Sequence, residues 1–140
     1  MKDDLQKLID DFSLFDDWEQ RYAYLIDMGK KIQGLPEDLK TDDRLVKGCT
    51  SKVWLILNWR EEQAGKSLEI KADSDAVIVR GLVALVMKVY NDCAPQDVLD
   101  INMQEGFKEM GLDAHLSPSR RNGFFSMIET IRLNAAAHNA

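Results

Sequence analysis

Cys49 is the residue whose type and surroundings point most directly to chemistry. It lies in the segment VKGCTSKVW, just before a predicted strand, and Gly48 permits another molecule to approach the backbone closely. Lys47 and Lys52 flank the cysteine and would favour its thiolate, the nucleophilic form of the side chain. The alternative is a buried cysteine that acts as a small hydrophobic residue, the commonest fate of a thiol outside disulfides.

The second cysteine and the histidines are the other side chains that could support thiol or metal chemistry. Cys93 lies in NDCAPQD, after a predicted helix, and we expect a buried structural role for it. A Cys49–Cys93 disulfide would need Cα atoms within about 7 Å, which the sequence leaves open. No motif places His115 or His138 as a base for Cys49, which disfavours a cysteine hydrolase. The cysteines and histidines also lack the paired spacing of a zinc site.

Three arginines occupy positions where a charge needs an explanation. Arg80 interrupts an otherwise apolar run, and burying an unpaired charge is costly. It must therefore pair with an acid such as Asp73 or Asp75, or face a cleft. Arg120 and Arg121 lie in the first turn of the last predicted helix, where cations oppose the helix dipole. They either pair with acids, for example from the Asp–Asp and Glu–Glu clusters, or form a docking or anion contact.

The elements that must position these residues begin with two amphipathic helices. Apolar residues recur at helical spacing in the first: Leu5, Leu8, Ile9 and Phe12. Asp16 is the expected N-cap of the second, with Glu19 as its capping-box partner. One face of that helix is lined by Trp18, Tyr22, Leu25, Gly29 and Ile32. Gly34 and Pro36 are expected to end it.

In the middle of the chain, the spacing of hydrophobic residues changes to the two-residue period of strands. Residues 53–61 and 67–72 read as an antiparallel hairpin joined by EEQAGK, and RLVKG before them adds a short third strand. The run AVIVRGLVALVMKVY then predicts a buried central helix, capped by Ser74 or Asp75. A buried strand is the competing interpretation, but the length and the Ala, Leu and Met content favour a helix. All three tryptophans, Trp18, Trp54 and Trp59, are expected in the core.

The last third of the chain is predicted to be helical. Residues 95–112 suggest short helical pieces, and Ser117 with Pro118 marks the start of a final helix. That helix should turn five residues inward: Phe124, Met127, Ile128, Ile131 and Ala135. The predicted fold class is α+β, with a small antiparallel sheet of about three strands covered by helices. Residues 1–140 are expected to form a single domain.

Composition narrows the classes of function. The chain has 140 residues, 45% of them hydrophobic, enough for one core but too few for two. Its net charge of −6 argues against nucleic acid as the main partner. The start, MKDDLQKLIDDF, lacks the features of a signal peptide, and no apolar run reaches the length of a membrane span. We therefore expect a cytoplasmic protein with reduced thiols and no membrane partner.

Four segments resemble a known family. They are, in chain order, WEQRYAYLIDMGKKIQGLP, VKGCTSKVWL, SDAVIVRGLVAL and HLSPSRRNGFFSMIETI. Together they are similar to the SufE family, the cysteine desulfuration proteins of iron–sulfur cluster assembly, which include the CsdE branch. The resemblance covers nearly the whole chain, and its order and spacing make it more specific than any single segment. Cys93 is not part of the family pattern, so no family role is assigned to it.

The resemblance implies a fold like that of SufE and the IscU-type scaffolds, and a function in sulfur transfer. Family members accept sulfur from a PLP-dependent cysteine desulfurase of the SufS type and stimulate that enzyme. The acceptor is the cysteine of the Gly–Cys motif, here Cys49, which becomes a persulfide. The sulfur then passes to a scaffold complex of the SufBCD type. PLP belongs to the desulfurase, so the resemblance implies no cofactor or metal in this chain and an accessory role rather than independent enzymatic activity.

Several alternatives stay open at this stage. The chain could be a CsdE-like partner that feeds another sulfur acceptor, or an adaptor that stimulates the desulfurase without carrying sulfur. The sequence does not decide between a monomer and a homodimer. The Cys49 loop and Arg120 are the expected docking surface. Val46 and Val53 suggest that Cys49 is sheltered until docking exposes it, since apolar burial lowers thiol reactivity.

Overall fold

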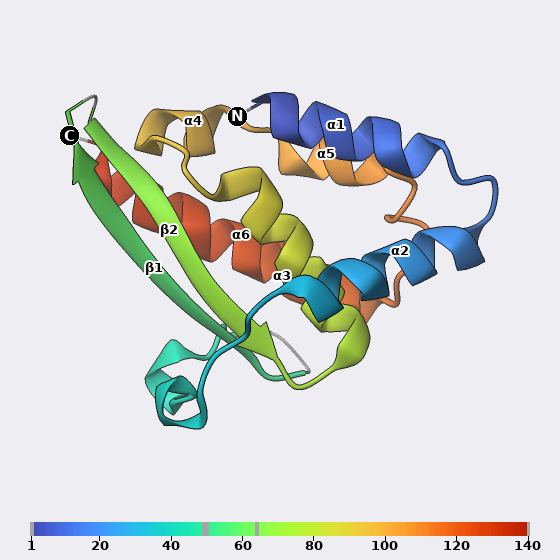
Figure 1. Cartoon of the computed structure of the whole chain (residues 1–140), viewed down its shortest axis with the longest axis horizontal. Coiled ribbons are helices and arrows are strands. Elements are labelled where there is room, and N and C mark those ends of the chain that lie inside the picture. Colours follow the sequence, from blue (N-terminus) through green and yellow to red (C-terminus); the bar gives the residue numbers. More distant parts are fainter. Residues whose placement is uncertain (1, 49–50, 64, 140) are drawn as a thin grey trace.

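The computed structural model of the chain describes residues 2–48, 51–63 and 65–139. The N-terminal half contains α1 (Lys2–Ser13), α2 (Trp18–Lys31), the short 3-10 helices η1 (Glu37–Leu39) and η2 (Asp42–Arg44), and the strands β1 (Val53–Glu62) and β2 (Gly65–Ser74). The C-terminal half contains α3 (Val77–Tyr90), α4 (Pro95–Asp100), α5 (Met103–Glu109) and α6 (Pro118–His138). The predicted α+β class is confirmed, with the α-helices gathered on one side of a hairpin (Figure 1).

The sheet is a long antiparallel hairpin. Its register runs from Val53 opposite Ser74 to Glu62 opposite Gly65, so both strands extend beyond the predicted bounds. In the described part of the chain the sheet has two strands rather than about three. The predicted third strand is reduced to one bridge, between Leu45 and Trp54. It stays short because η2 occupies the residues before Leu45 and the chain turns directly after Val46.

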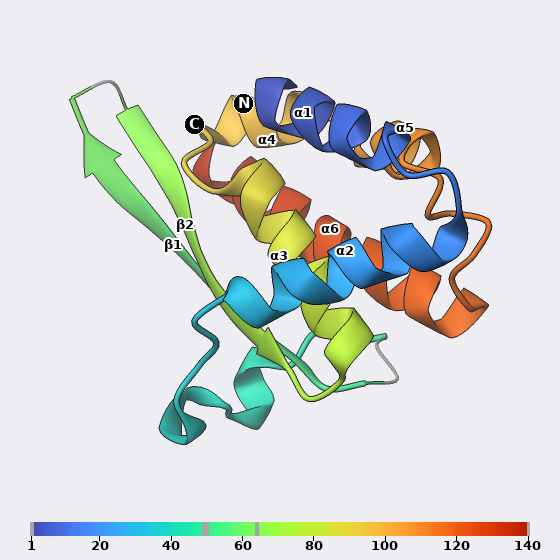
Figure 2. The same ribbon diagram turned by 45° about the vertical axis from the view of Figure 1, so that its right-hand side comes forward.

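The hairpin packs along α3, and its tip projects beyond the end of α6, where Trp59 contacts Asn134 and His138 (Figure 2). Side chains on one face of the strands enter the core, among them Val53, Leu68 and Ile70. Trp54 is buried, as predicted, but Trp18 and Trp59 are only half-buried at the edge of the core.

The central element is α3, as the apolar run predicts. Ten of its residues are buried, and it packs against α2 and β2. Two glycines set the crossing with α2. A Cβ on Gly81 would lie 2.4 Å from the Leu25 carbonyl oxygen, and one on Gly29 would lie 2.7 Å from the Gly81 nitrogen. The two backbones therefore approach more closely than any residue with a side chain would allow.

Of the predicted helix N-caps, that of α6 is correct and that of α2 is wrong by one residue. Ser117 caps α6, with Pro118 at the first helical position, and its side chain accepts a hydrogen bond from the Arg120 N–H, as predicted. The α2 cap is Asp17 rather than Asp16, and it accepts from the Gln20 N–H, so Glu19 is not the capping partner.

The start of α3 also differs from the prediction. Its N-cap is Ala76, which makes no side-chain hydrogen bond to the helix. The side chains of Ser74 and Asp75, the predicted caps, bond to the backbone of Lys52 instead.

The remaining helices follow the predicted pattern. The segment 95–112 forms α4 and α5, and α1 lies beside α5 in both views (Figures 1 and 2). The five residues predicted to face inward from α6 are all buried: Phe124, Met127, Ile128, Ile131 and Ala135. One continuous cluster of buried apolar side chains joins the helices to the hairpin.

Candidate functional site

Cys49, the predicted acceptor, lies outside the described residues together with Thr50, but the chain on both sides of them is described. The residues that precede and follow the segment 47–52 meet at the start of β1. There the Val46 N–H donates a 2.9 Å hydrogen bond to the Val53 carbonyl, and both valines are buried. The candidate site is therefore a loop whose base is fixed on the core at the start of β1.

Gly48 has a backbone that only glycine adopts readily. Its φ is +90°, in the left-handed region. A Cβ at this position would lie 2.8 Å from the Ser126 Oγ on α6, closer than side chains tolerate. The glycine beside the predicted acceptor thus turns the chain and lets it pass against α6.

A second set of contacts holds the other end of the loop. The Lys52 N–H donates to Asp75 Oδ1 at 3.1 Å, and the Lys52 carbonyl accepts from the Ser74 hydroxyl at 2.8 Å. The Asp75 N–H also donates to the Lys52 carbonyl, at 3.3 Å. These bonds tie the entry to β1 to the turn between β2 and α3, so the polar residues expected to cap α3 fasten the loop instead.

The two lysines beside the predicted acceptor are exposed. Lys47 and Lys52 lie at the surface, and Ser51 is half-buried. Their effect on the Cys49 thiol, and the sheltering of that thiol before docking, stay predictions about a residue outside the described part.

Arg80 pairs with one of the two expected acids. Its Nη1 donates to Asp73 Oδ1 at 2.7 Å, while its Nε and Nη2 donate to the carbonyls of Gly29 and Ile32. Burial works against ionisation of Asp73, but the Leu35 and Ser74 N–H groups, with Arg80 and Lys40, hold its pKa below the usual value. The arginine is a structural clamp that joins the end of α2 to α3 and β2.

Of the two arginines on α6, Arg121 pairs with an acid, as one of the two interpretations expected, whereas Arg120 contacts a tyrosine. The Arg120 Nη1 donates to the Tyr22 hydroxyl at 2.7 Å, and the Arg121 Nη1 donates to the Asp113 carbonyl at 3.0 Å. Arg121 also lies 3.9 Å from the Asp113 carboxylate, an acid outside the predicted clusters. Arg120 is exposed on the helix that carries Ser126, so its proposed docking role stays open to test.

Cys93 has the buried position expected of a structural cysteine. Its side chain is fully buried, and its Sγ donates to the Val89 carbonyl at 3.4 Å. Burial raises the pKa of the thiol to about 11. At neutral pH the thiolate population is therefore negligible, and the thiol is a poor nucleophile.

Both histidines stack on tryptophans. The His115 ring lies 4.5 Å from the Trp18 ring, and the His138 ring lies 5.3 Å from the Trp59 ring, near the hairpin tip. Neither histidine has a described contact with the loop flanks, in line with the lack of a base motif. No cluster of metal-ligating side chains occurs among the described residues.

Comparison with known proteins agrees with this geometry. The family model of SufE, described as an Fe-S metabolism associated domain, matches residues 6–135. The chain belongs to the SufE family. It is thereby associated with Fe–S metabolism, and the match spans the candidate loop and both elements that fasten it. The predicted resemblance is confirmed.

The fold of this SufE-family protein also matches a solved structure. The solution structure of a hypothetical protein from Thermus thermophilus superimposes with a TM-score of 0.77 at 15% identity, covering 96% of this chain and 95% of that one. At this identity the likeness concerns the fold. Within the described residues, no helix of the SufE-family chain is long and apolar enough to cross a membrane.

Two contacts of the SufE loop escaped the sequence analysis. Ser126 was not singled out, because only the folded chain brings α6 against Gly48. Asp75 was considered as a helix cap or a partner of Arg80, not as an acceptor for the Lys52 N–H. Ser74 and Asp75, directly before the apolar helix, indicate a polar turn. The sequence does not show that Asp75 bonds to Lys52, because Lys52 lies 23 positions away.

Proposed function

We propose that this protein accepts sulfane sulfur from a PLP-dependent cysteine desulfurase of the SufS type, as a persulfide on Cys49. The observation that carries the proposal is the SufE family match over residues 6–135, which includes the Gly48–Cys49 motif. The sulfur then goes to an Fe–S scaffold complex of the SufBCD type. In this proposal the chain also stimulates the desulfurase, which it contacts through the loop 47–52.

The proposed transfer is a thiol–persulfide exchange. The Cys49 thiolate attacks the outer sulfur of the donor persulfide, a new S–S bond forms, and the donor S–S bond breaks. The donor cysteine leaves as a thiolate, and the outer sulfur keeps its proton as it becomes the terminal sulfur of the Cys49 persulfide. The exchange is balanced without an external oxidant or reductant, because one S–S bond replaces another.

The described residues support this role in two ways. Hydrogen bonds hold the described residues on both sides of Cys49 and Thr50: Val46 bonds to Val53, and Lys52 bonds to Ser74 and Asp75. Meanwhile Cys93 is buried and its pKa is raised to about 11, so it does not compete for sulfur. A second reactive thiol nearby would release the sulfur as sulfide and leave a disulfide.

Intact-mass spectrometry tests the proposal. The full chain is incubated with a SufS-type desulfurase, PLP and cysteine, in parallel with Cys49→Ser and Cys93→Ala variants. We expect a gain of about 32 Da, one sulfur, on the wild type and on Cys93→Ala but not on Cys49→Ser. Cys93→Ala is the matched control, because it removes the other thiol and leaves a small apolar side chain in the core.

Two outcomes would contradict the proposal. Sulfur on the Cys49→Ser variant would place the acceptor elsewhere. No added sulfur on any variant, while desulfurase turnover still rises, would make the protein an adaptor that activates by binding alone.

A further inference from the structure

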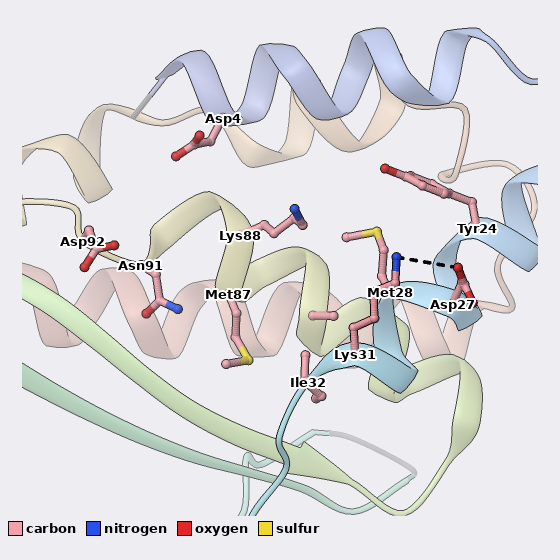
Figure 3. A pocket seen from close by; sticks show the side chains of 11 residues that line it. Asp4, Tyr24, Asp27, Met28, Lys31, Ile32, Met87, Lys88, Asn91 and Asp92 are labelled. Atoms are coloured by element: carbon pink, nitrogen blue, oxygen red, sulfur yellow. Dashed lines mark ion pairs between the residues drawn. The ribbon is translucent and has the colours of Figure 1, made fainter.

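A cavity far from the Cys49 loop along α3 is not used by the proposed function. It has a volume of about 370 Å³ and lies between α1, α2 and the C-terminal half of α3 (Figure 3). Its apolar lining comes from Met28 on α2, from Ile32 directly after α2, and from Ala84 and Met87 on α3. Thioether side chains adapt their shape readily to apolar ligands. The volume is near the lower end for ligand pockets, which favours a small molecule over a nucleotide.

Among the described residues, two exposed charges on the rim, one cation and one anion, have no protein partner. Lys31 is 3.8 Å from Asp27, and Asp92 forms an ion pair with Arg60, so these rim carboxylates are already compensated. In the described part of the chain, the side chains of Asp4 and Lys88 form no hydrogen bond and no ion pair, although both line the cavity.

These two residues border two hollows in common. Both also border a smaller hollow of about 130 Å³ between α1 and α3, although they do not form an ion pair with each other. In Figure 3, Asp4 extends from α1 on one side of the cavity, and the Lys88 ammonium lies between α1 and α2. A ligand with charges of both signs would satisfy both residues.

We propose that this cavity binds a small zwitterionic α-amino acid with a linear apolar side chain. Its carboxylate pairs with Lys88, its ammonium pairs with Asp4, and its side chain rests on Met28 and Met87. The opposite charges of the ligand match these two rim groups, and the apolar side chain covers the part of Met87 that water otherwise contacts.

Titration of the ¹⁵N-labelled full chain with L-methionine, followed by NMR, tests the proposal. We expect saturable shifts of amides at the cavity, including those of Met87, Lys88 and Asn91. Two probes each lack one charge: 3-(methylthio)propylamine has no carboxylate, and 4-(methylthio)butanoic acid has no ammonium. Each should bind about tenfold more weakly than L-methionine, because one charge-assisted contact is lost.

Two variants and one control variant test which charge of the ligand pairs with Lys88 and which with Asp4. Lys88→Met keeps an apolar stem of similar length and should weaken L-methionine binding about tenfold, while it removes the preference for L-methionine over the amine probe. Asp4→Asn should remove the preference over the carboxylic acid probe. Lys30→Met is the matched control, since Lys30 is exposed on α2 and does not line the cavity.

Three results would overturn the proposal. They are shifts that fail to saturate, saturable shifts outside the cavity, and an unchanged L-methionine affinity in both Lys88→Met and Asp4→Asn. The amide spectrum of each variant reports its folding in the same experiment.

Discussion

At the scale of single residues, the two cysteines differ in their sequence context, and the structure describes the surroundings of Cys93. Cys93 is fully buried below the outer edge of β2, where its carbonyl accepts the Leu68 N–H at 2.9 Å. Its thiol has a pKa raised to about 11 by burial. Cys49 follows a glycine in a loop between exposed lysines. The difference predicts that a single thiol carries the chemistry of this protein.

We predict that Cys93 is unreactive in the folded protein. In the Cys49→Ser variant, reaction with a thiol reagent such as DTNB at pH 8 should be slow, because the remaining thiol is buried and protonated. The same variant in concentrated urea should react at the rate of an ordinary cysteine. Fast labelling of the native variant would show that the α3–α4 junction opens readily.

The raised pKa of Cys93 also predicts a pH dependence of stability. The unfolded thiol ionises near its ordinary pKa of 9.0, whereas the folded thiol stays protonated up to about 11. The unfolded state therefore binds fewer protons in this interval, and the free energy of unfolding should fall as the pH rises through it. Urea unfolding of the wild type and Cys93→Ala measures this, since the variant should lack that part of the decline.

Gly48 provides a prediction about the loop itself. Gly48→Ala should destabilise the protein by about 1–2 kcal/mol, because alanine resists a φ of +90° and its Cβ would contact the Ser126 hydroxyl. Sulfur acceptance should fall as well. Gly65→Ala is the matched control, since Gly65 also has a positive φ, +119°, but nothing lies within 4 Å of its Cβ position. Equal loss of sulfur acceptance in both variants would contradict a specific role of the α6 contact.

At the scale of secondary-structure elements, one buried carboxylate joins segments that are distant in sequence. Asp73, at the end of β2, accepts hydrogen bonds from the Leu35 N–H at 3.0 Å and from Arg80 on α3 at 2.7 Å. Lys40 Nζ lies 3.5 Å from the same carboxylate. The end of α2, the segment after it, the hairpin and α3 therefore share one polar junction directly before the turn that fastens the Cys49 loop.

Asp73→Asn should destabilise the fold by about 2 kcal/mol at pH 7. The asparagine leaves Arg80 without its counter-charge, and this cost is moderated because the Arg80 side chain is 31% exposed. Because the pKa of Asp73 is lowered in the folded state, its contribution is present above the ordinary value of 3.8 and is lost as the pH falls below it. Urea unfolding at pH 7 and at pH 3 measures both effects, with the exposed Asp38→Asn as the control.

At the scale of the whole molecule, the core is one continuous cluster that reaches from α1 to α6 and includes the hairpin base. The accessible surface is 7856 Å², close to the area expected for a compact chain of this size. Such a core predicts that residues 1–140 unfold as one unit. Tryptophan fluorescence reports on α2 and β1, and far-UV circular dichroism reports on all helices. Their urea transitions should coincide, and separated midpoints would contradict a single cooperative domain.

The sequence by itself determined the order and type of the elements and the family. Apolar periodicity identified α1, α3 and the buried face of α6, and the Ser117–Pro118 pair marked the start of α6, because these signals are local. The Gly–Cys motif pointed to Cys49 for the same reason. The family match confirms the resemblance, while the role of Cys49 stays a proposal.

Only the tertiary structure decided which distant groups meet. Sequence reasoning left Arg80 with two acids or a cleft, and packing of α2 on α3 selected Asp73. The folded chain also brings the Asp75 carboxylate to the Lys52 N–H and Ser126 against Gly48. The predicted third strand is one bridge, between Leu45 and Trp54. These contacts join residues far apart along the chain. The close crossing of α2 and α3 at Gly29 and Gly81 is a further contact of this kind, because it depends on how two helices pack rather than on a local pattern.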